Sequence, residues 1–204
     1  MKLFLASRTD GSLDLVRPLL TADPNKLKFV LITTATNPYP ADNRPWCVQN
    51  KAKLTEFGFD PIEYDLSGKD TSTLRRDLFG FDIIYVEGGN VFYLLNEVRK
   101  SGFDLVIREL LAAGKIYMGS SAGAMIMGPS LDHLLTIDDP SIVPDLTDYS
   151  GLGYIEQKII PHFGREKYRQ KHEALKATYK DALTFLRDDQ AVIVNDVQVN
   201  IVTL

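Results

Sequence analysis

Ile116-Tyr-Met-Gly-Ser-Ser-Ala-Gly-Ala124 is the stretch of sequence that best indicates the fold. It starts as an apolar run typical of a buried strand, turns through small residues, and leads into an apolar segment, 124–127, that favours a helix. Within it, Gly119-Ser-Ser-Ala-Gly123 matches the pattern Gly-x-Ser-x-Gly. In a strand-to-helix turn of this kind the central serine stands at the carboxyl edge of a sheet, and the glycines remove side chains that would collide. We therefore expect Ser121 at the edge of an α/β sheet.

The alternation of strand and helix extends to both sides of this turn. The expected strands are short apolar runs at 3–6, 29–33, 61–66, 81–86 and 116–119. The expected helices have apolar residues spaced near 3.6 and cover 14–20, 43–57, 71–78, 91–101 and 103–113. Strands that alternate with helices pair in parallel through crossover connections. The pattern predicts a three-layer α/β sandwich with a mostly parallel sheet.

The last third of the chain is less regular. Residues 129–153 are rich in Pro, Asp and Ser and exceed an ordinary connection, which indicates a functional loop. A strand over 157–160, a long helix over 166–186, and a hairpin pairing 191–194 with 198–202 complete the expected elements. At this length, and with no internal repeat, we expect residues 1–204 to form a single domain.

Composition excludes several classes of protein. A net charge of -4 disfavours a nucleic-acid surface, which normally carries a basic field. The single cysteine, Cys47, cannot form an internal disulfide, and the first eight residues hold too short an apolar run for a secretory signal. No apolar run approaches the roughly 20 residues needed to span a bilayer. We expect a cytoplasmic protein with no nucleic-acid or membrane partner.

A second glycine-rich turn, Glu87-Gly-Gly-Asn90, directly follows the expected strand 81–86. Paired glycines at a strand end leave backbone N–H groups exposed. Acyl transfer needs two such donors aimed at the oxyanion, one after the nucleophile and one from a neighbouring loop, and Ala122 and Gly89 fit these places. Alone, Gly-Gly-Asn is also an ordinary turn with a helix cap.

A serine nucleophile needs a base, and imidazole has the right pKa. His162 ends an apolar run and is expected at the same sheet edge as Ser121. His133 lies in the loop after the serine turn, and His172 falls in a charged helix where we expect it to be solvated. Ser120 is the competing hydroxyl, but the glycines two before and two after Ser121 centre the turn there.

A carboxylate bonded to the imidazole would fix its tautomer and stabilise the imidazolium formed during attack. Thr136-Ile-Asp-Asp-Pro140 lies in the irregular loop between the serine and the histidine. Either Asp138 or Asp139 could serve, and a polar turn before proline is the alternative interpretation. The spacing alone does not show whether Asp138 or Asp139 would contact the imidazole.

Four motifs in chain order resemble those of the dipeptidase E and cyanophycinase-like serine peptidases. They are Gly88-Gly-Asn90 with Leu94-Leu95, Gly119-x-Ser-Ala-Gly-Ala124, Asp138-x-Pro140, and Pro161-His-Phe163. The resemblance runs through most of the chain and implies a flavodoxin-like sheet related to class I glutamine amidotransferases, with serine in place of cysteine. It also implies a serine-type dipeptidase or exopeptidase that cleaves short peptides through an acyl-enzyme, with no metal or cofactor. We expect a monomer or small homo-oligomer.

The resemblance assigns the catalytic residues one by one. Ser121 matches the nucleophile and His162 the general base. Asp138 matches the third member of the triad because it stands two residues before Pro140, and Asp139 is the reserve.

The resemblance also assigns the groups around the substrate. Gly89 and Ala122 match the oxyanion positions, and Asn90 matches an asparagine beside the site. A preference for N-terminal aspartate would need a basic group, for which the candidates are Arg165, Lys167 and Arg169. The alternative interpretation of this charged run is the solvated start of a helix.

Two rival functions remain open at this point. An esterase or amidase acting on small acyl substrates would use the same serine turn. A binding module without turnover would carry the serine with no imidazole in reach. Nucleotide binding is disfavoured because the sequence holds neither Gly-x-Gly-x-x-Gly nor a Walker loop.

Overall fold

The computed structural model describes the backbone of residues 1–204 and every side chain except that of Asp181. Seven strands form one sheet in the order β3-β2-β4-β5-β1-β8-β9. The parallel strands are β1 (Lys2–Ala6), β2 (Phe29–Ile32), β3 (Pro61–Tyr64), β4 (Ile83–Val86) and β5 (Ile116–Ser120). The antiparallel hairpin of β8 (Gln190–Asn195) and β9 (Gln198–Thr203) extends the sheet beside β1. The predicted α/β fold with a mostly parallel sheet is confirmed.

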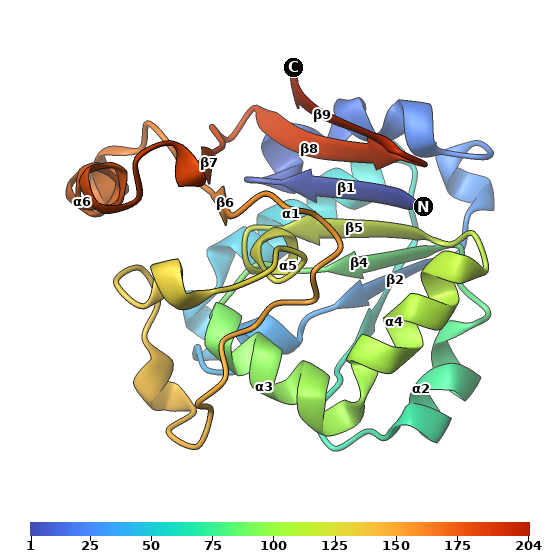
Figure 1. Cartoon of the computed structure of the whole chain (residues 1–204). Coiled ribbons are helices and arrows are strands. Elements are labelled where there is room, and N and C mark those ends of the chain that lie inside the picture. Colours follow the sequence, from blue (N-terminus) through green and yellow to red (C-terminus); the bar gives the residue numbers. More distant parts are fainter.

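Helices cover both faces of the sheet, which gives the predicted three layers (Figure 1). In β1, Leu3 and Leu5 pack on one side, while Phe4 and Ala6 pack on the other, because successive side chains of a strand point to opposite faces. The first face is covered by α2 (Thr71–Leu78), α3 (Val91–Ser101) and α4 (Phe103–Ala112). The second face is covered by α1 (Pro45–Phe57) and by the 3-10 helix Leu13–Leu19. Shorter 3-10 turns lie at Thr9–Gly11 and Pro24–Lys26.

The first expected helix, 14–20, is a 3-10 helix instead of an α-helix. It covers Leu13–Leu19 and contains Pro18, which has no N–H to donate to the preceding turn. The other helices before the serine turn match their expected positions to within two residues. Two further 3-10 turns, Thr34–Thr36 and Ala41–Asn43, connect β2 to α1.

The prediction of one long helix over 166–186 is wrong, because the α-helix there ends at Tyr179. A 3-10 turn at Glu166–Tyr168 leads into α6 (Arg169–Tyr179), a further turn follows at Lys180–Ala182, and β7 (Thr184–Phe185) then pairs in parallel with β6 (Ile159–Ile160). The loop 129–153 holds 3-10 turns at Asp132–Leu134 and Pro140–Ile142. Among the described residues, no helix is both long and apolar enough to cross a bilayer.

The carboxyl ends of β1, β4 and β5 lie at one edge of the sheet, at the left of Figure 1. Because β8 runs antiparallel to β1, with Ala6 opposite Ala191, the beginning of β8 lies at that same edge. The segments that contain β6, β7 and α6 also lie there. This edge therefore gathers loops from distant parts of the sequence.

Candidate active site

Ser121 stands in a strained turn between β5 and α5 (Ala122–Met125). Its backbone has φ 48° and ψ -106°, a conformation that costs a non-glycine residue roughly 1–3 kcal/mol. The Ser121 amide donates to the Ala6 carbonyl at 3.0 Å. A Cβ on Gly119 would lie 2.4 Å from the Gly123 carbonyl oxygen, so the turn needs glycine there. Because α5 has only four residues, its helix dipole adds little at the serine.

The neighbouring hydroxyls point to different partners. Ser120 is buried, and its Oγ accepts a hydrogen bond from the Thr9 amide at 3.3 Å. Ser121 Oγ lies 3.2 Å from Nε2 of His162. Of the two hydroxyls, that of Ser121 faces the His162 imidazole.

The His162 imidazole is held on its other side by Asp188. His162 Nδ1 lies 2.9 Å from Asp188 Oδ1. Ser7, which directly follows β1, joins the two residues: its Oγ accepts from the His162 amide at 2.7 Å and donates to Asp188 Oδ1 at 2.9 Å. A hydroxyl, an imidazole and a carboxylate thus form one hydrogen-bonded chain at the sheet edge.

The sequence pointed to Asp138, with Asp139 in reserve, as the carboxylate on the imidazole, and the structure places neither there. Asp138 Oδ2 accepts from the Val91 amide at the start of α3, at 2.9 Å. Asp139 Oδ1 accepts from the Ser141 amide at 2.9 Å. The sequence pattern pointed to a carboxylate in the loop between Ser121 and His162, whereas Asp188 lies after His162, just before the antiparallel strand β8. Its position just before the hairpin was the signal available in the sequence.

Asp188 is ionised at neutral pH. Burial pulls its pKa upward, but hydrogen bonds from His162, Ser7 and Arg165 outweigh burial and hold the pKa at about 2. Arg165 donates from Nε to Asp188 Oδ2. The guanidinium of Arg165, an expected contact for an acidic substrate side chain, is therefore engaged by the protein itself.

Two backbone amides near Ser121 are free to act as donors. Among the described residues, none accepts a hydrogen bond from the amide of Gly89 or of Ala122. Gly89 has φ 157°, and a Cβ there would lie 2.1 Å from the Ala35 carbonyl oxygen, so only glycine fits. The two amides have the chemistry of an oxyanion hole.

Asn90 does not line the site, contrary to expectation. Its side-chain oxygen accepts from the Tyr93 amide at 2.9 Å and caps α3, and its Nδ2 donates to the Asp139 carbonyl at 3.1 Å. Both ends of the amide are thus used within the protein. Asn90 fixes the loop 129–153 to the start of α3.

A buried carboxyl lies beneath the Gly88-Gly89 turn. Glu87 accepts from the Gly88 amide at 2.8 Å and from Asn50 Nδ2 at 2.5 Å. Burial raises the pKa of Glu87 to about 7 despite these hydrogen bonds. Glu87 therefore changes its charge near neutral pH.

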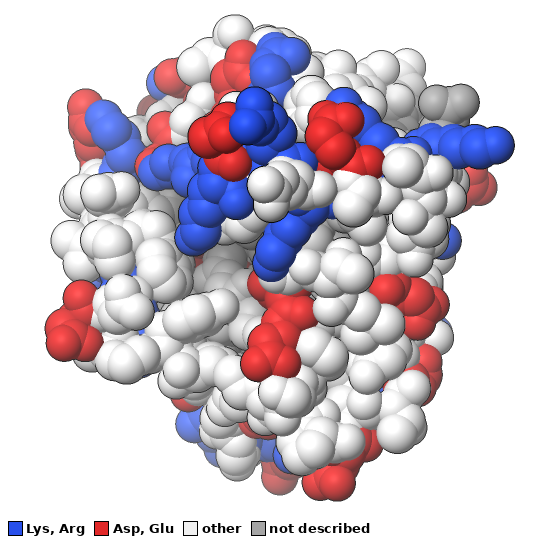
Figure 2. All heavy atoms as spheres, turned by 90° about the vertical axis from the view of Figure 1, so that its left-hand side faces the viewer, with Lys and Arg blue, Asp and Glu red and all other residues white. Residues whose placement is uncertain are grey.

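Ser121 and His162 open onto a cleft of about 450 Å³. Figure 2 looks onto this edge of the sheet and shows the hollow, bordered by basic side chains above and acidic ones below. Tyr39 and Trp46 line it with a T-shaped contact, their ring centroids 5.5 Å apart. Tyr168 stacks on the His162 ring with centroids 5.3 Å apart. The volume suits a small ligand or a short peptide.

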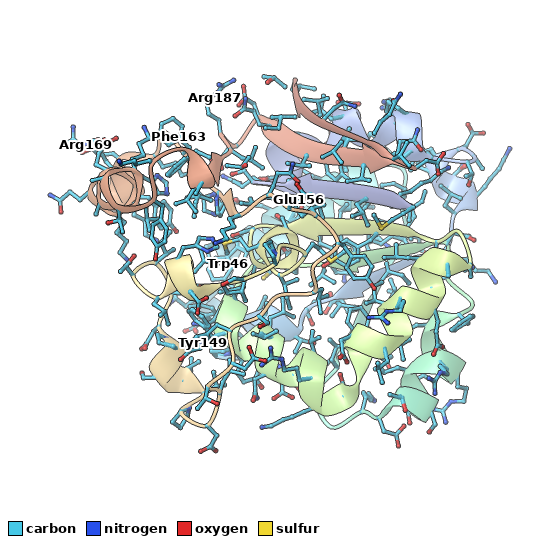
Figure 3. The ribbon with its side chains drawn as sticks, viewed as in Figure 1. Trp46, Tyr149, Glu156, Phe163, Arg169 and Arg187 are labelled. Atoms are coloured by element: carbon cyan, nitrogen blue, oxygen red, sulfur yellow. The ribbon has the colours of Figure 1, made fainter. Side chains whose placement is uncertain are left out.

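Of the three basic candidates, only Lys167 lines the cleft without a carboxylate partner among the described residues. Arg169 pairs with Glu166 at 2.9 Å, is 67% exposed, and stands on α6 at the outside of the molecule (Figure 3). His172 is buried, and so the expectation that it is solvated was wrong. It packs on Tyr168, with ring centroids 5.7 Å apart.

Comparison with known proteins identifies the family. The sequence model of peptidase family S51 matches residues 3–202. The chain belongs to peptidase family S51. The fold and the family predicted from the four motifs are thereby confirmed, and the S51 assignment makes the chain a serine-type peptidase.

Two relatives of this S51 peptidase cover nine tenths or more of its length, and a third covers a shorter part. An uncharacterized peptidase of Listeria innocua is 30% identical over 187 residues, which is 90% of each chain. Another, of Pasteurella multocida, is 31% identical over 202 residues, covering 96% of this chain and 94% of the relative. The peptidase E of Shewanella amazonensis is 37% identical over 134 residues, which is 62% of this chain and 55% of that protein.

The fold is closely similar to that of a solved structure. A candidate peptidase E of Listeria monocytogenes EGD-e is 27% identical, covers 100% of this chain and 98% of its own, and superposes with a TM-score of 0.90. The S51 fold is thus shared over the whole chain.

Proposed function

We propose that this S51 peptidase hydrolyses short peptides through a catalytic triad of Ser121, His162 and Asp188. Ser121 attacks the scissile carbonyl while His162 takes its proton through Nε2, and Asp188 holds the Nδ1 proton and stabilises the imidazolium. The amides of Gly89 and Ala122 receive the oxyanion. His162 then returns the proton to the leaving amine, and water releases the acyl-enzyme by the same route.

One observation carries this proposal, namely the continuous chain from Ser121 Oγ through His162 to Asp188, with distances of 3.2 and 2.9 Å. Ser121 and His162 open onto a cleft of about 450 Å³, a size that favours dipeptides or other short peptides over folded substrates. The relatives named peptidase E favour a peptide substrate. A binding module without turnover has no need of an imidazole so placed.

The test is a dipeptide-library assay of the wild type against Ser121→Ala. Removing the nucleophile should lower turnover by roughly three or more powers of ten. Ser120→Ala is the matched control, because its hydroxyl contacts Thr9 and should leave turnover nearly unchanged. Retention of most activity by Ser121→Ala would refute the assignment, and faster hydrolysis of short-chain esters than of every dipeptide would favour the esterase alternative.

A further inference from the structure

Asp138 lines the cleft with an unused carboxylate oxygen. Its Oδ2 accepts from the Val91 amide at 2.9 Å, but among the described residues no donor reaches Oδ1. The chain on either side is held in place, by Lys171 Nζ on the Ile137 carbonyl at 2.9 Å and by Asn90 Nδ2 on the Asp139 carbonyl at 3.1 Å. The free oxygen therefore has a fixed position in the cleft wall.

The surroundings of Asp138 favour an incoming cation. Burial raises the pKa of this carboxyl, and the Val91 amide and the positive field of Lys171 only partly offset burial. A carboxylate that loses water without gaining a full partner is destabilised in its charged form. A cation bound at Oδ1 would supply the missing compensation.

Aromatic rings complete the surroundings of this carboxylate. Tyr39 lines the same cleft as Asp138, and burial, followed by the negative field of Asp138, raises the pKa of the Tyr39 hydroxyl to about 12. Trp46 stands edge-on to Tyr39, and Tyr168 lines the same cleft. A carboxylate together with aromatic rings is the chemistry that recognises an ammonium group.

The guanidinium groups of the cleft are already paired. Arg8 is bound by Asp10 and Arg165 by Asp188. Lys167 remains as a cation without a carboxylate partner among the described residues. The cleft thus offers a free anion at Asp138 and a free cation at Lys167, which matches the two charged ends of a short peptide.

We propose that Asp138 is a specificity-determining residue that binds the primary ammonium group of the peptide substrate at Oδ1. In a short peptide this group is the α-ammonium, which makes the enzyme specific for free N-termini. The inference deepens the proposed function and rests on it.

The experiment compares Asp138→Asn with the wild type on one dipeptide sequence in free and Nα-acetylated forms. Asparagine keeps an oxygen for the Val91 amide. Asp139→Asn is the matched control, since that side chain caps the turn at Ser141 and does not line the cleft. Asp138→Asn should lower kcat/KM on the free peptide roughly 10- to 100-fold, mainly through KM, while hydrolysis of the acetylated peptide changes little.

A third substrate, an Nα-acetyl-lysyl dipeptide, carries only a side-chain ammonium. A loss confined to this substrate would overturn the assignment to the α-ammonium, because the site would then bind a lysine side chain. An equal loss on all three substrates, or no loss on any, would overturn the proposal, because a purely structural residue does not distinguish free from blocked amines.

Calorimetry on Ser121→Ala separates this inference from the proposed function. In Ser121→Ala, the free dipeptide should bind roughly 10-fold or more tightly than its acetylated form. In the double variant with Ser121→Ala and Asp138→Asn, the two peptides should bind equally. Equal binding of both peptides by Ser121→Ala would refute the ammonium site. Failure of the triad would show separately, as turnover that survives Ser121→Ala.

Discussion

Replacement of Asp188 by asparagine is the sharpest test of the catalytic chain. The asparagine amide can donate to His162 Nδ1 and so favours the tautomer that carries its proton on Nε2. That tautomer cannot accept the proton of Ser121. In the proposed triad, Asp188→Asn should therefore slow acylation by roughly 10³- to 10⁴-fold.

The same substitution has a cost in stability that follows from the pKa of Asp188. A pKa of about 2 in place of the ordinary 3.8 corresponds to roughly 2 kcal/mol in favour of the folded state when the group is charged, and to less where solvent screens it. Because the folded pKa is the lower one, this stability is present above about pH 4 and is lost as the pH falls through about 2. Asp188→Asn should lower the free energy of unfolding by up to about 2 kcal/mol at pH 7.

The rate of covalent labelling of Ser121 by a fluorophosphonate measures the reactivity of the serine without a choice of peptide, and urea unfolding at pH 7 measures stability. Asp189→Asn is the control, because Asp189 pairs with Arg187 at 3.1 Å and does not contact His162. Asp138→Asn should label at nearly the wild-type rate. Near wild-type labelling of Asp188→Asn together with slow labelling of Asp138→Asn would refute the structural assignment and restore the one made from sequence.

Two further predictions concern the residues around the oxyanion site. Ser121→Gly should relieve the strain at φ 48° and raise the melting temperature by about 2–4 °C over Ser121→Ala while abolishing labelling; equal melting in calorimetry would contradict the strain. Glu87 keeps its proton in the folded state up to about pH 7 but releases it near 4.5 when unfolded, so its contribution to stability should fall by about 3 kcal/mol as the pH rises between these values. Glu87→Gln should remove this fall in urea unfolding at pH 5 and pH 8, and an unchanged pH dependence would refute the raised pKa.

The parts of the fold with strong local signals could be predicted from the sequence. Helices 71–78 and 91–101 lie where apolar spacing and caps put them, since Asp70 and Asn90 accept from the amides of Thr73 and Tyr93. The prediction of a helix over 166–186 failed because local sequence does not determine the structure there. Pairing of Thr184 and Phe185 with Ile159 and Ile160 is a contact between distant residues, and such tertiary contacts override helix propensity.

In the candidate site too, some residues are indicated by local sequence and others depend on tertiary structure. Ser121 and His162 belong to motifs whose local sequence predicts a strand end, and the structure places both residues just after strands and within 3.2 Å of each other. Asp188 could not be ranked above the other aspartates because its role depends on the direction of β8, and direction is a property of strand pairing rather than of local sequence. Spacing before Pro140 favoured Asp138, whose carboxylate the Val91 amide in fact holds.

In the proposed scheme Asp188 serves catalysis and Asp138 serves substrate recognition. Ser121, His162 and Asp188 are tied to the sheet through Ala6, through Ser7 and through the start of β8. Asp138 belongs to the loop 129–153, which meets α3 through hydrogen bonds at its first turn. Because loops tolerate change better than the strands they connect, substitution in this loop can alter which peptide end is bound while the hydrogen-bonded chain at the sheet edge keeps its geometry. Selectivity for free amines should therefore vary among S51 peptidases with residue 138, independently of the rate at which Ser121 reacts.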